Sequence, residues 1–258
     1  MKATQDISSH KRQNKSVDIV LQVKNLSKAF GEKKVISDFN LALKKGENVV
    51  VLGKSGSGKS VLIKLIIGLI KADKGEINVL GEDIHNLNSN DLDAIRARIG
   101  FLFQSNALYD SMSVRQNLEF PLRRHQTDLT RKEIDDLVME ALTNVGLTET
   151  LDMQPSELSG GMRKRIALAR TLILKPEIIL YYEPTTGLDP ITGREISNLI
   201  EELAHKYNTS SIIISHDLNC VKIVADRIIM LIDGTCYAEG TLNSLSKSTD
   251  EKIKTFFE

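Results

Sequence analysis

The sequence lacks an excess of either charge, any long apolar run and any metal-ligand or redox spacing of cysteines. Lys and Arg together number 34, as do Asp and Glu, so the composition favours neither nucleic acid nor an acidic membrane surface as a partner. The two cysteines, Cys220 and Cys236, are expected to be reduced thiols in the cytoplasm. No stretch reaches the ~18 apolar residues of a membrane span, and the N-terminus has no apolar signal core. Any membrane role is therefore expected to come through a partner protein.

What the sequence does have is a glycine-rich phosphate-binding loop, whose residues match the pattern G-x-x-x-x-G-K-[ST]. An apolar run, 49–52, precedes it as expected of a buried parallel strand, and a mostly apolar segment, 61–67, follows as expected of a buried helix. The glycines let backbone N–H groups point at phosphates, so we expect nucleotide binding by Gly53, Lys54, Ser55, Gly56, Ser57, Gly58, Lys59, Ser60 and Val61. Within this P-loop, Lys59 is expected to reach the β- and γ-phosphates and the Ser60 hydroxyl to ligate Mg²⁺. The alternative is a chance match in a glycine-rich turn, and the strand and helix on either side argue against it.

Strand and helix patterns alternate along the chain, which predicts an α/β fold with a mostly parallel sheet and helices on both faces. Segments before the P-loop predict an edge strand at 18–23 and a hairpin that turns near Gly31, and hence an antiparallel β subdomain. After residue 105 strand signals vanish, which indicates an inserted α-helical subdomain at about 105–172. The predicted organisation is a flexible polar extension, a nucleotide-binding domain and a tail, at residues 1–17, 18–246 and 247–258.

A second glycine turn, Ser159-Gly160-Gly161, distinguishes among the classes of P-loop protein. A serine and two glycines at a helix start form another anion site, although a plain helix cap is the alternative. With this run in place, the chain resembles the nucleotide-binding subunit of ABC (ATP-binding cassette) proteins from about residue 19 to residue 245. The resemblance implies a RecA-like core, ATP and Mg²⁺ as cofactors, and a head-to-tail homodimer with ATP sandwiched between subunits. In such a dimer this turn contacts the γ-phosphate bound to the opposite subunit.

The resemblance also implies roles for five further positions. Phe30 matches the aromatic residue that stacks on adenine, with Val35 beside it, and a plain hairpin aromatic is the alternative. Gln104 matches the Q-loop glutamine, which ligates Mg²⁺ or the attacking water. Asp189 matches the D-loop aspartate, which communicates across the dimer. His216 matches the switch histidine, which hydrogen-bonds the γ-phosphate.

One position departs from the family pattern, beside the expected general base. Glu183 follows the buried strand 178–181 and matches the glutamate that polarises the attacking water. The residue before it is Tyr182, where the family has the aspartate that holds Mg²⁺. A phenol is neutral at pH 7, so a negative charge is missing, and with it a charge-assisted hydrogen bond of roughly 1.5–3 kcal/mol. We expect weaker Mg²⁺-ATP binding, slower hydrolysis or both; a tolerated natural variant, a regulatory subunit and an altered sequence all stay open as explanations.

Smaller features are similar to the ATPases of Mla/Mce-type phospholipid transporters. They are Met162 after the second glycine turn, the run 107–118, the tetrapeptide 189–192 and the ending 248–257. This resemblance implies an ATPase on the cytoplasmic face of the inner membrane, with an integral-membrane permease and a periplasmic lipid-binding subunit as partners. The alternatives are a regulatory, hydrolysis-impaired subunit and an import-type cassette for amino acids or lipoproteins. A soluble ABC protein of translation or DNA repair is disfavoured because the chain holds a single cassette.

Two surface assignments follow from the same resemblance. The segment 107–123 is expected near the groove that receives a permease helix, and packing inside the subdomain is the alternative for its apolar members Leu108, Tyr109, Met112 and Val114. The basic run Arg163-Lys164-Arg165 is expected to be a solvated helix face or a phosphate-facing surface rather than a nucleic-acid site. No nucleic-acid partner is expected.

Overall fold

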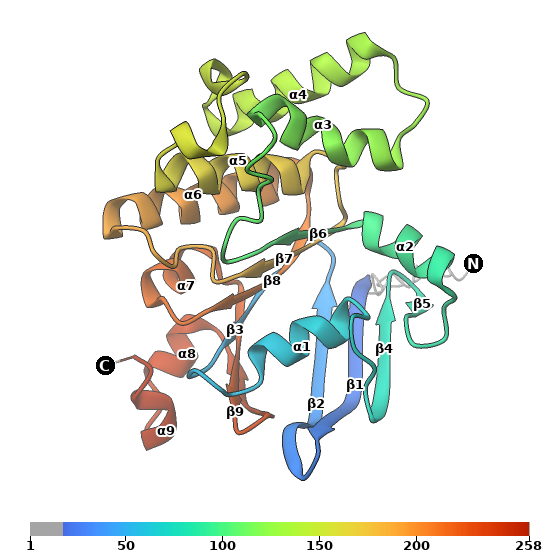
Figure 1. The fold of residues 1–258 in the computed structure, drawn as a ribbon. Helices are drawn as coiled ribbons and strands as arrows, with labels where there is room; N and C mark the ends of the chain where they lie inside the picture. Colours follow the sequence, from blue (N-terminus) through green and yellow to red (C-terminus); the bar gives the residue numbers. More distant parts are fainter. Residues whose placement is uncertain (1–17, 258) are drawn as a thin grey trace, which may run out of the picture.

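The computed structural model describes residues 18–257, which form two β-sheets and a set of covering helices (Figure 1). The predicted flexible extension, residues 1–17, lies outside the described residues. The strands are β1 (Ile19–Phe30), β2 (Lys33–Lys44), β3 (Asn48–Leu52), β4 (Lys74–Val79), β5 (Glu82–Asp83), β6 (Ile99–Leu102), β7 (Ile178–Tyr182), β8 (Ser210–Ser215), β9 (Arg227–Ile232) and β10 (Thr235–Gly240). The α-helices are α1 (Lys59–Ile66), α2 (Ser89–Ala97), α3 (Val114–His125), α4 (Arg131–Val145), α5 (Gly160–Leu172), α6 (Pro190–Tyr207), α7 (Leu218–Val224), α8 (Leu242–Ser246) and α9 (Glu251–Lys254).

The first sheet has four antiparallel strands in the order β2-β1-β4-β5. Its long hairpin turns at Gly31, as predicted, because the αL backbone there (φ 60°) suits glycine. The prediction of an edge strand at the start of the described chain is wrong. β1 lies between β2 and β4, since its second edge pairs with residues that follow the P-loop helix.

The second sheet has six strands in the order β10-β9-β3-β8-β7-β6. The pairs from β9 through β6 are parallel and only β10 runs antiparallel, after an Asp233-Gly234 turn. Parallel strands are buried on both faces, and every residue of β3 and β8 is buried accordingly. The predicted mostly parallel P-loop core with an antiparallel β unit is therefore confirmed.

Alternation of side chains along the parallel strands separates two hydrophobic cores. Val49 and Val51 of β3 face α1, which lies between the two sheets (Figure 1). Val50 and Leu52 face the opposite side, where α3 to α7 contribute apolar side chains. The apolar residues Leu62, Ile63, Leu65 and Ile66 of the P-loop helix are buried in the first of these cores, whereas Ser60 and Lys64 are exposed.

The helices α3, α4 and α5 form a layer above the parallel sheet, with α6 beneath them (Figure 1). Ser113 and Thr130 begin α3 and α4 with capping boxes, and Ser159 begins α5 with a side-chain cap. Asn88 begins α2, where its side chain accepts from Asn90 N and Asp91 N, and Asp189 begins α6 in the same way. The assignment of residues 105–172 to one subdomain stays a prediction. Within residues 18–257, the longest apolar helical stretch falls short of a membrane span.

Candidate nucleotide-binding site

The P-loop joins the end of β3 to the start of α1 and presents an anion-binding turn. Gly58, the residue before the helix, has a φ of 107°, and a Cβ there would lie 2.8 Å from the Val35 carbonyl oxygen. Only glycine fits this position, because both the backbone conformation and the space exclude a side chain. The buried Ser57 hydroxyl has no hydrogen-bond partner in the structure. A turn of this shape at a helix N-terminus with an orphaned hydroxyl fits the phosphates of ATP.

Lys59 is the first residue of α1, and its side chain folds back over the loop. Its Nζ donates to the carbonyl oxygens of Gly53 at 2.6 Å and Lys54 at 2.9 Å. Burial lowers the pKa of the Lys59 ammonium, and the charge of Glu183 opposes that shift. The ammonium group is therefore held over the loop by two neutral carbonyl oxygens, which the charged oxygens of a phosphate can replace.

Glu183 lies directly after β7 and is buried, with 7% of the residue exposed. Its φ of 50° is unusual for a residue with a side chain, and such strain concentrates at functional sites. The Oε2 atom lies 2.8 Å from Nδ1 of His216 and accepts a hydrogen bond from the Thr186 hydroxyl at 3.2 Å. Two residues that the sequence separates by 33 positions thus meet at the ends of neighbouring parallel strands.

Tyr182 lies where the Mg²⁺ ligand of the family pattern is expected, and it contacts the other expected ligand. Its hydroxyl is 2.5 Å from the Ser60 Oγ atom, so one of the two oxygens donates to the other. Ser60 and the Gln104 amide are neutral oxygen donors that fit Mg²⁺ together with phosphate oxygens and water. Tyr182 does not fit, because it adds no negative charge and keeps the Ser60 oxygen engaged.

One open pocket gathers most of the predicted ATP-site residues. Its lining consists of Val35, Gly53, Lys54, Ser55, Gly56, Gly58, Lys59, Ser60, Val61, Gln104, Tyr182, Glu183, His216, Thr255 and Phe256. Ser57 lines an adjoining pocket beside the same loop. Phe30 is outside this lining: its ring is 52% exposed and lies 5.4 Å from Lys28 Nζ. The exposed ring is free to meet a base from solvent, and its adenine role stays a prediction.

The second glycine turn and Asp189 also lie outside the pocket, but they lie together. Ser159 accepts from the Met162 N–H at 3.2 Å and begins α5, while Asp189 accepts from Ile191 N and Thr192 N, each at 3.1 Å, and begins α6. A Cβ on Gly161 would lie 2.7 Å from Thr192 Cγ2, so glycine permits the two helix starts to pack closely. Ser159 and Gly160 are exposed, so the N–H groups at this helix start are accessible to solvent, and the anion-binding role of the turn stays a prediction.

The C-terminal tail supplies two pocket residues that the sequence interpretation missed. Thr255 and Phe256 line the pocket, and Lys54 Nζ lies 5.7 Å from the centroid of the Phe256 ring. The tail is fastened by the Tyr237 hydroxyl, which donates to Asp250 at 2.8 Å, and by buried Ile253. The alternation of apolar and charged residues in the tail indicates a packed helix, but no local pattern shows which surface it covers.

Lys164 contradicts the prediction that the run 163–165 is a solvated or phosphate-facing surface. Its side chain is 1% exposed, and Nζ donates to the Gln104 carbonyl oxygen at 3.0 Å. Burial lowers the pKa of Lys164 to about 8. The helical period places this residue on the same face as buried Ala167 and Leu168, a signal that the unbroken basic run conceals.

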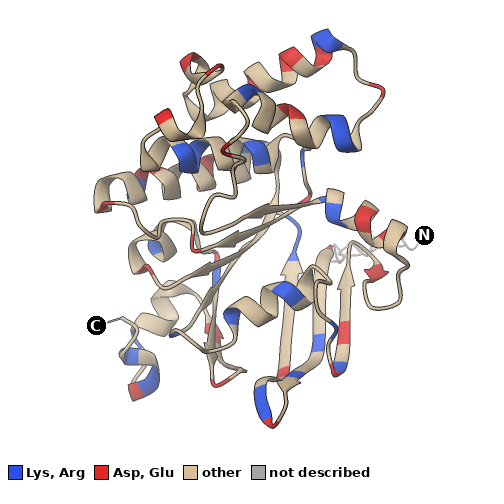
Figure 2. Ribbon diagram, viewed as in Figure 1, with Lys and Arg blue, Asp and Glu red and all other residues tan. Residues whose placement is uncertain are grey.

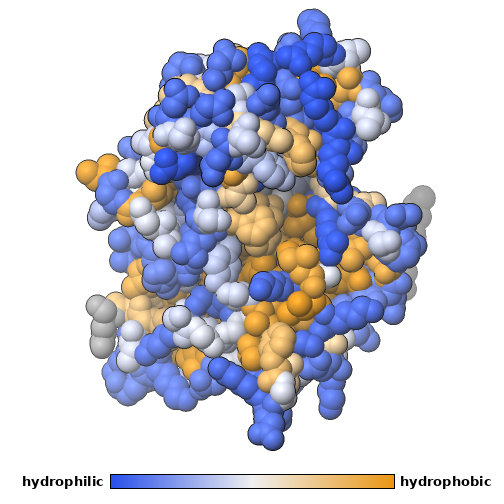
Figure 3. All heavy atoms as spheres, viewed as in Figure 1, coloured by the Kyte–Doolittle hydropathy of each residue, from blue (hydrophilic) through white to orange (hydrophobic). Residues whose placement is uncertain are grey.

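A groove bordered by α2, β6, α3 and α5 lies next to the layer of helices. Its charged lining is mainly basic, with Arg96, Arg124, His125 and Arg170 against one acid, Asp93. Figure 3 shows exposed apolar side chains in the depression between the upper helices and α2, and the exposed aromatic residues of this part of the chain are Phe103, Tyr109 and Phe120. Elsewhere in this view charges of both signs are interspersed (Figure 2). Val114, one of the predicted groove members, is fully buried in the core, so it cannot line the surface.

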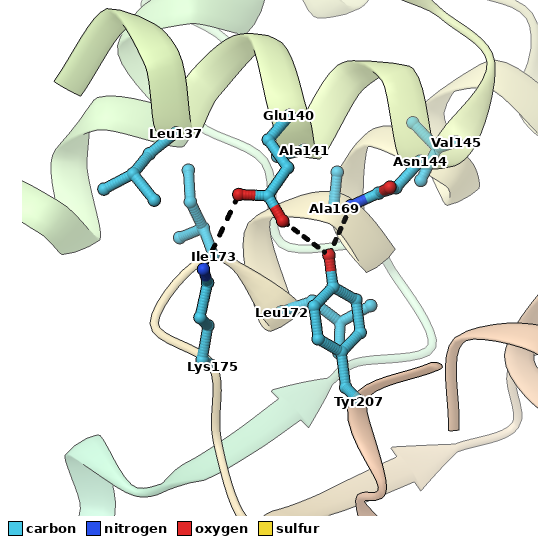
Figure 4. A pocket seen from close by; sticks show the side chains of 10 residues that line it. All are labelled: Leu137, Glu140, Ala141, Asn144, Val145, Ala169, Leu172, Ile173, Lys175 and Tyr207. Atoms are coloured by element: carbon cyan, nitrogen blue, oxygen red, sulfur yellow. Dashed lines mark hydrogen bonds and ion pairs between the residues drawn. The ribbon is translucent and has the colours of Figure 1, made fainter. Parts of the chain in front are cut away.

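A smaller pocket between α4, α5 and α6 is polar on one side (Figure 4). There the Tyr207 hydroxyl lies 3.3 Å from Glu140 Oε1 and accepts a hydrogen bond from Asn144, while Lys175 pairs with Glu140 at 3.5 Å. These contacts tie α4 to the core helix α6 and fill the polar side of the pocket.

Comparison with known proteins agrees with this geometry. The ABC transporter family pattern matches residues 36–186 of the chain. The chain belongs to the ABC transporter ATP-binding family. Among its relatives, the intermembrane phospholipid transport system ATP-binding protein MlaF of Haemophilus influenzae is 40% identical over 92% of this chain and 89% of its own length. The probable ribonucleotide transport ATP-binding protein mkl of Mycobacterium leprae is also 40% identical, over 92% of this chain and 68% of its own.

A solved structure carries the same fold. It is a dimeric ATP-binding cassette in a post-hydrolysis state bound to ADP and Pi, with a TM-score of 0.78, 33% identity, and coverage of 86% of this chain and 98% of that one. The family, the fold neighbour and the assembled P-loop site together establish this ABC cassette as an ATPase that binds ATP.

Proposed function

We propose that the chain is the energy-coupling ATPase of a lipid transporter, closing as a dimer on ATP and reopening on hydrolysis. The single observation that carries this proposal is the division of the nucleotide machinery. The lining of the P-loop pocket includes Lys59, Glu183 and His216, whereas the Ser159 turn is not part of this lining. In this proposal a complete ATP site consists of the P-loop pocket of one chain and the Ser159 turn of a second copy. Two chains together therefore form two such sites.

The residue roles in this proposal follow from the geometry. Lys59 transfers its hydrogen bonds from the Gly53 and Lys54 carbonyls to phosphate oxygens. Glu183 orients and deprotonates the attacking water, and His216 fixes the position of the Glu183 carboxylate through their 2.8 Å contact. Ser60 and Gln104 would hold Mg²⁺ together with phosphate oxygens, and the ion would supply charge neutralisation. Asp189 and the turn of Ser159, Gly160 and Gly161 meet the other subunit.

The membrane partner in this proposal is a permease whose cytoplasmic helix enters the groove between α2, β6 and α3. The basic lining favours a helix with acidic residues, and the exposed rings of Phe103 and Phe120 favour an apolar stripe beside them. Lipid as the cargo rests on the similarity to the phospholipid-transport protein, and the relative named for ribonucleotide transport makes a nucleotide cargo the competing assignment. The same proposal includes a periplasmic lipid-binding subunit as a further partner, and it places this chain at the cytoplasmic face of the inner membrane.

A second candidate function is favoured by Tyr182. The Ser60 hydroxyl is engaged by Tyr182 rather than by a carboxylate, so Mg²⁺ would be held less tightly and turnover would be slow. In this candidate the chain is a regulatory subunit that closes on ATP and hydrolyses it slowly.

Steady-state ATPase assays of the purified chain and Glu183→Gln test the proposal. We expect ATP binding to be retained in Glu183→Gln and turnover to fall about a hundredfold, because only the charge of the base is lost. Equal turnover in both proteins would refute the role of Glu183. Turnover near zero in the parent, with ATP still binding, would favour the regulatory candidate. Co-purification with a membrane permease, lost when Arg96 and Arg124 are changed to Glu, tests the groove.

A further inference from the structure

Lys164 is a buried cation with an unusual partner. At 1% exposure its ammonium group lies in the interior, and its hydrogen bond goes to a backbone carbonyl, that of Gln104, at 3.0 Å. Among the described residues no acidic side chain pairs with it, and burial is the cause that lowers its pKa to about 8. A buried ammonium without a counter-ion is costly, so an apolar residue would stabilise this position better. We therefore infer that the role of Lys164 is to hold the Gln104 carbonyl in place.

That carbonyl stands at the point where the chain leaves the parallel sheet. β6 ends at Leu102, and Gln104 lines the nucleotide pocket two residues later. Shortly after Gln104, Asn106 and Ala107 have positive φ values of 67° and 52°, respectively. Neither is glycine, so this sharp bend needs external contacts to hold it.

The helix α5 supplies contacts at both ends of the bend. Lys164 holds the beginning, at Gln104. Arg170 lies on α5 six positions further along, where its guanidinium is 5.6 Å from the Tyr109 ring and 3.4 Å from Asn117 Oδ1. Asn117 in turn donates to the Tyr109 carbonyl at 3.1 Å and accepts from the Tyr109 N–H at 2.8 Å. The segment 104–109 is thus fastened to α5 at its two ends, whereas the parallel sheet holds it only through β6.

We propose that Lys164 is a positioning residue that fastens the Gln104 segment to α5, so that Gln104 moves with the Ser159 turn at the start of the same helix. This inference rests on the proposed function, in which the Ser159 turn meets the nucleotide of the partner subunit. Gln104 lines the nucleotide pocket of its own chain. One rigid helix then connects the two ATP sites of the dimer, and closure at one site repositions the glutamine at the other.

The first test uses the protein without nucleotide. Hydrogen exchange of peptides covering 103–109 is compared in the parent, Lys164→Met, Lys164→Arg and the control Lys132→Met, which alters an exposed lysine on α4. Methionine keeps the volume and removes the donor, so exchange in this segment is expected to be about tenfold faster, as for loss of one charge-assisted hydrogen bond. Lys164→Arg and Lys132→Met are expected to match the parent. Parent-like exchange in Lys164→Met would overturn the proposal.

The second test follows the glutamine segment during ATP binding. The chain contains no tryptophan, so Phe103→Trp, next to Gln104 and 44% exposed, gives a single fluorescent reporter. With this reporter, Lys164→Met is expected to keep the KM for ATP, lose most of the ATP-dependent fluorescence change and lower kcat about tenfold, and Lys164→Arg to restore both. An undiminished fluorescence change in Lys164→Met would contradict the coupling. Absence of ATP binding in the parent would refute the proposed function instead. The hydrogen-exchange test would then still show whether Lys164 fastens the Gln104 segment to α5.

Discussion

Two buried lysines hold backbone carbonyls at the ends of parallel strands, and they differ in what surrounds them. Lys59, 7% exposed, lies over the P-loop after β3, and the charge of Glu183 partly compensates its burial. Lys164, 1% exposed, lies under the segment after β6 and has no such compensation. Lys59 thus faces an open pocket where an anion can replace its carbonyl partners, whereas Lys164 faces the interior. A lysine side chain therefore binds the ligand at position 59, whereas at position 164 it holds a backbone segment in place.

The largest effect is expected where the lysine meets the ligand. Lys59→Met removes the cation and its hydrogen bonds to phosphate, so ATP affinity is expected to fall about a hundredfold or more. The isothermal titration of ATP into this variant is compared with that of Lys164→Met, which leaves Lys59 and the P-loop unchanged. If both variants lose affinity equally, the distinction between the two lysines is wrong.

The pH dependence of stability sharpens the comparison at Lys164. Its pKa in the folded chain is about 8, below the ordinary lysine value of 10.5, so the unfolded state binds more protons between these pH values. The Lys164 contribution to folding therefore improves as pH rises from about 8 to 10, by roughly 3 kcal/mol at most. Urea unfolding at pH 7 and pH 10 is measured for the parent and Lys164→Met, since the difference between them cancels the titration of other groups. An identical pH dependence in the two proteins would show that Lys164 is not desolvated in solution.

A charge added beside Lys59 tests the metal side of that site. Tyr182→Asp is expected to strengthen ATP binding about tenfold in the presence of Mg²⁺ and to leave it unchanged in EDTA, because the carboxylate acts through the cation. Tyr182→Phe is the matched control: it frees Ser60 from its 2.5 Å contact without adding charge. A gain of the same size in both variants would assign the effect to the freed Ser60 hydroxyl rather than to the carboxylate.

The smallest expected effect concerns the tail that closes the Lys59 pocket. Phe256→Ala removes the ring that lies 5.7 Å from Lys54 Nζ, and ATP affinity is expected to change about two- to threefold. Phe257→Ala, which alters a residue packed against the core, serves as the control in the same titration. Equal affinity in the parent and Phe256→Ala would mean that the ring lines the pocket without touching the nucleotide.

Much of the molecule can be predicted from the sequence because its signals are local. Glycine spacing and a following lysine predict the P-loop, apolar runs predict the parallel strands, and the Asp233-Gly234 turn predicts the last hairpin. The meeting of Glu183 with His216 was not predicted, because it depends on the pairing of β7 with β8.

The features that escaped prediction depend on distant packing. β1 is an inner strand because residues that follow α1 return to pair with it, which its own sequence does not reveal. Phe256 reaches the P-loop through a tail held by Tyr237 and Ile253, contacts that lie many residues away from the loop. Lys164 lies in a run of three basic residues, and only the phase of α5 against the Gln104 segment shows which of the three is buried.

Sedimentation velocity of Glu183→Gln with and without ATP tests most directly the claim that each chain carries half of a composite site. Because this variant keeps the P-loop and the Ser159 turn but hydrolyses slowly, we expect a monomer without ATP and a dimer at saturating ATP. Ser159→Phe added to it is expected to bind ATP and remain monomeric. A chain saturated with ATP that stays monomeric in the absence of the Ser159 change would contradict the account.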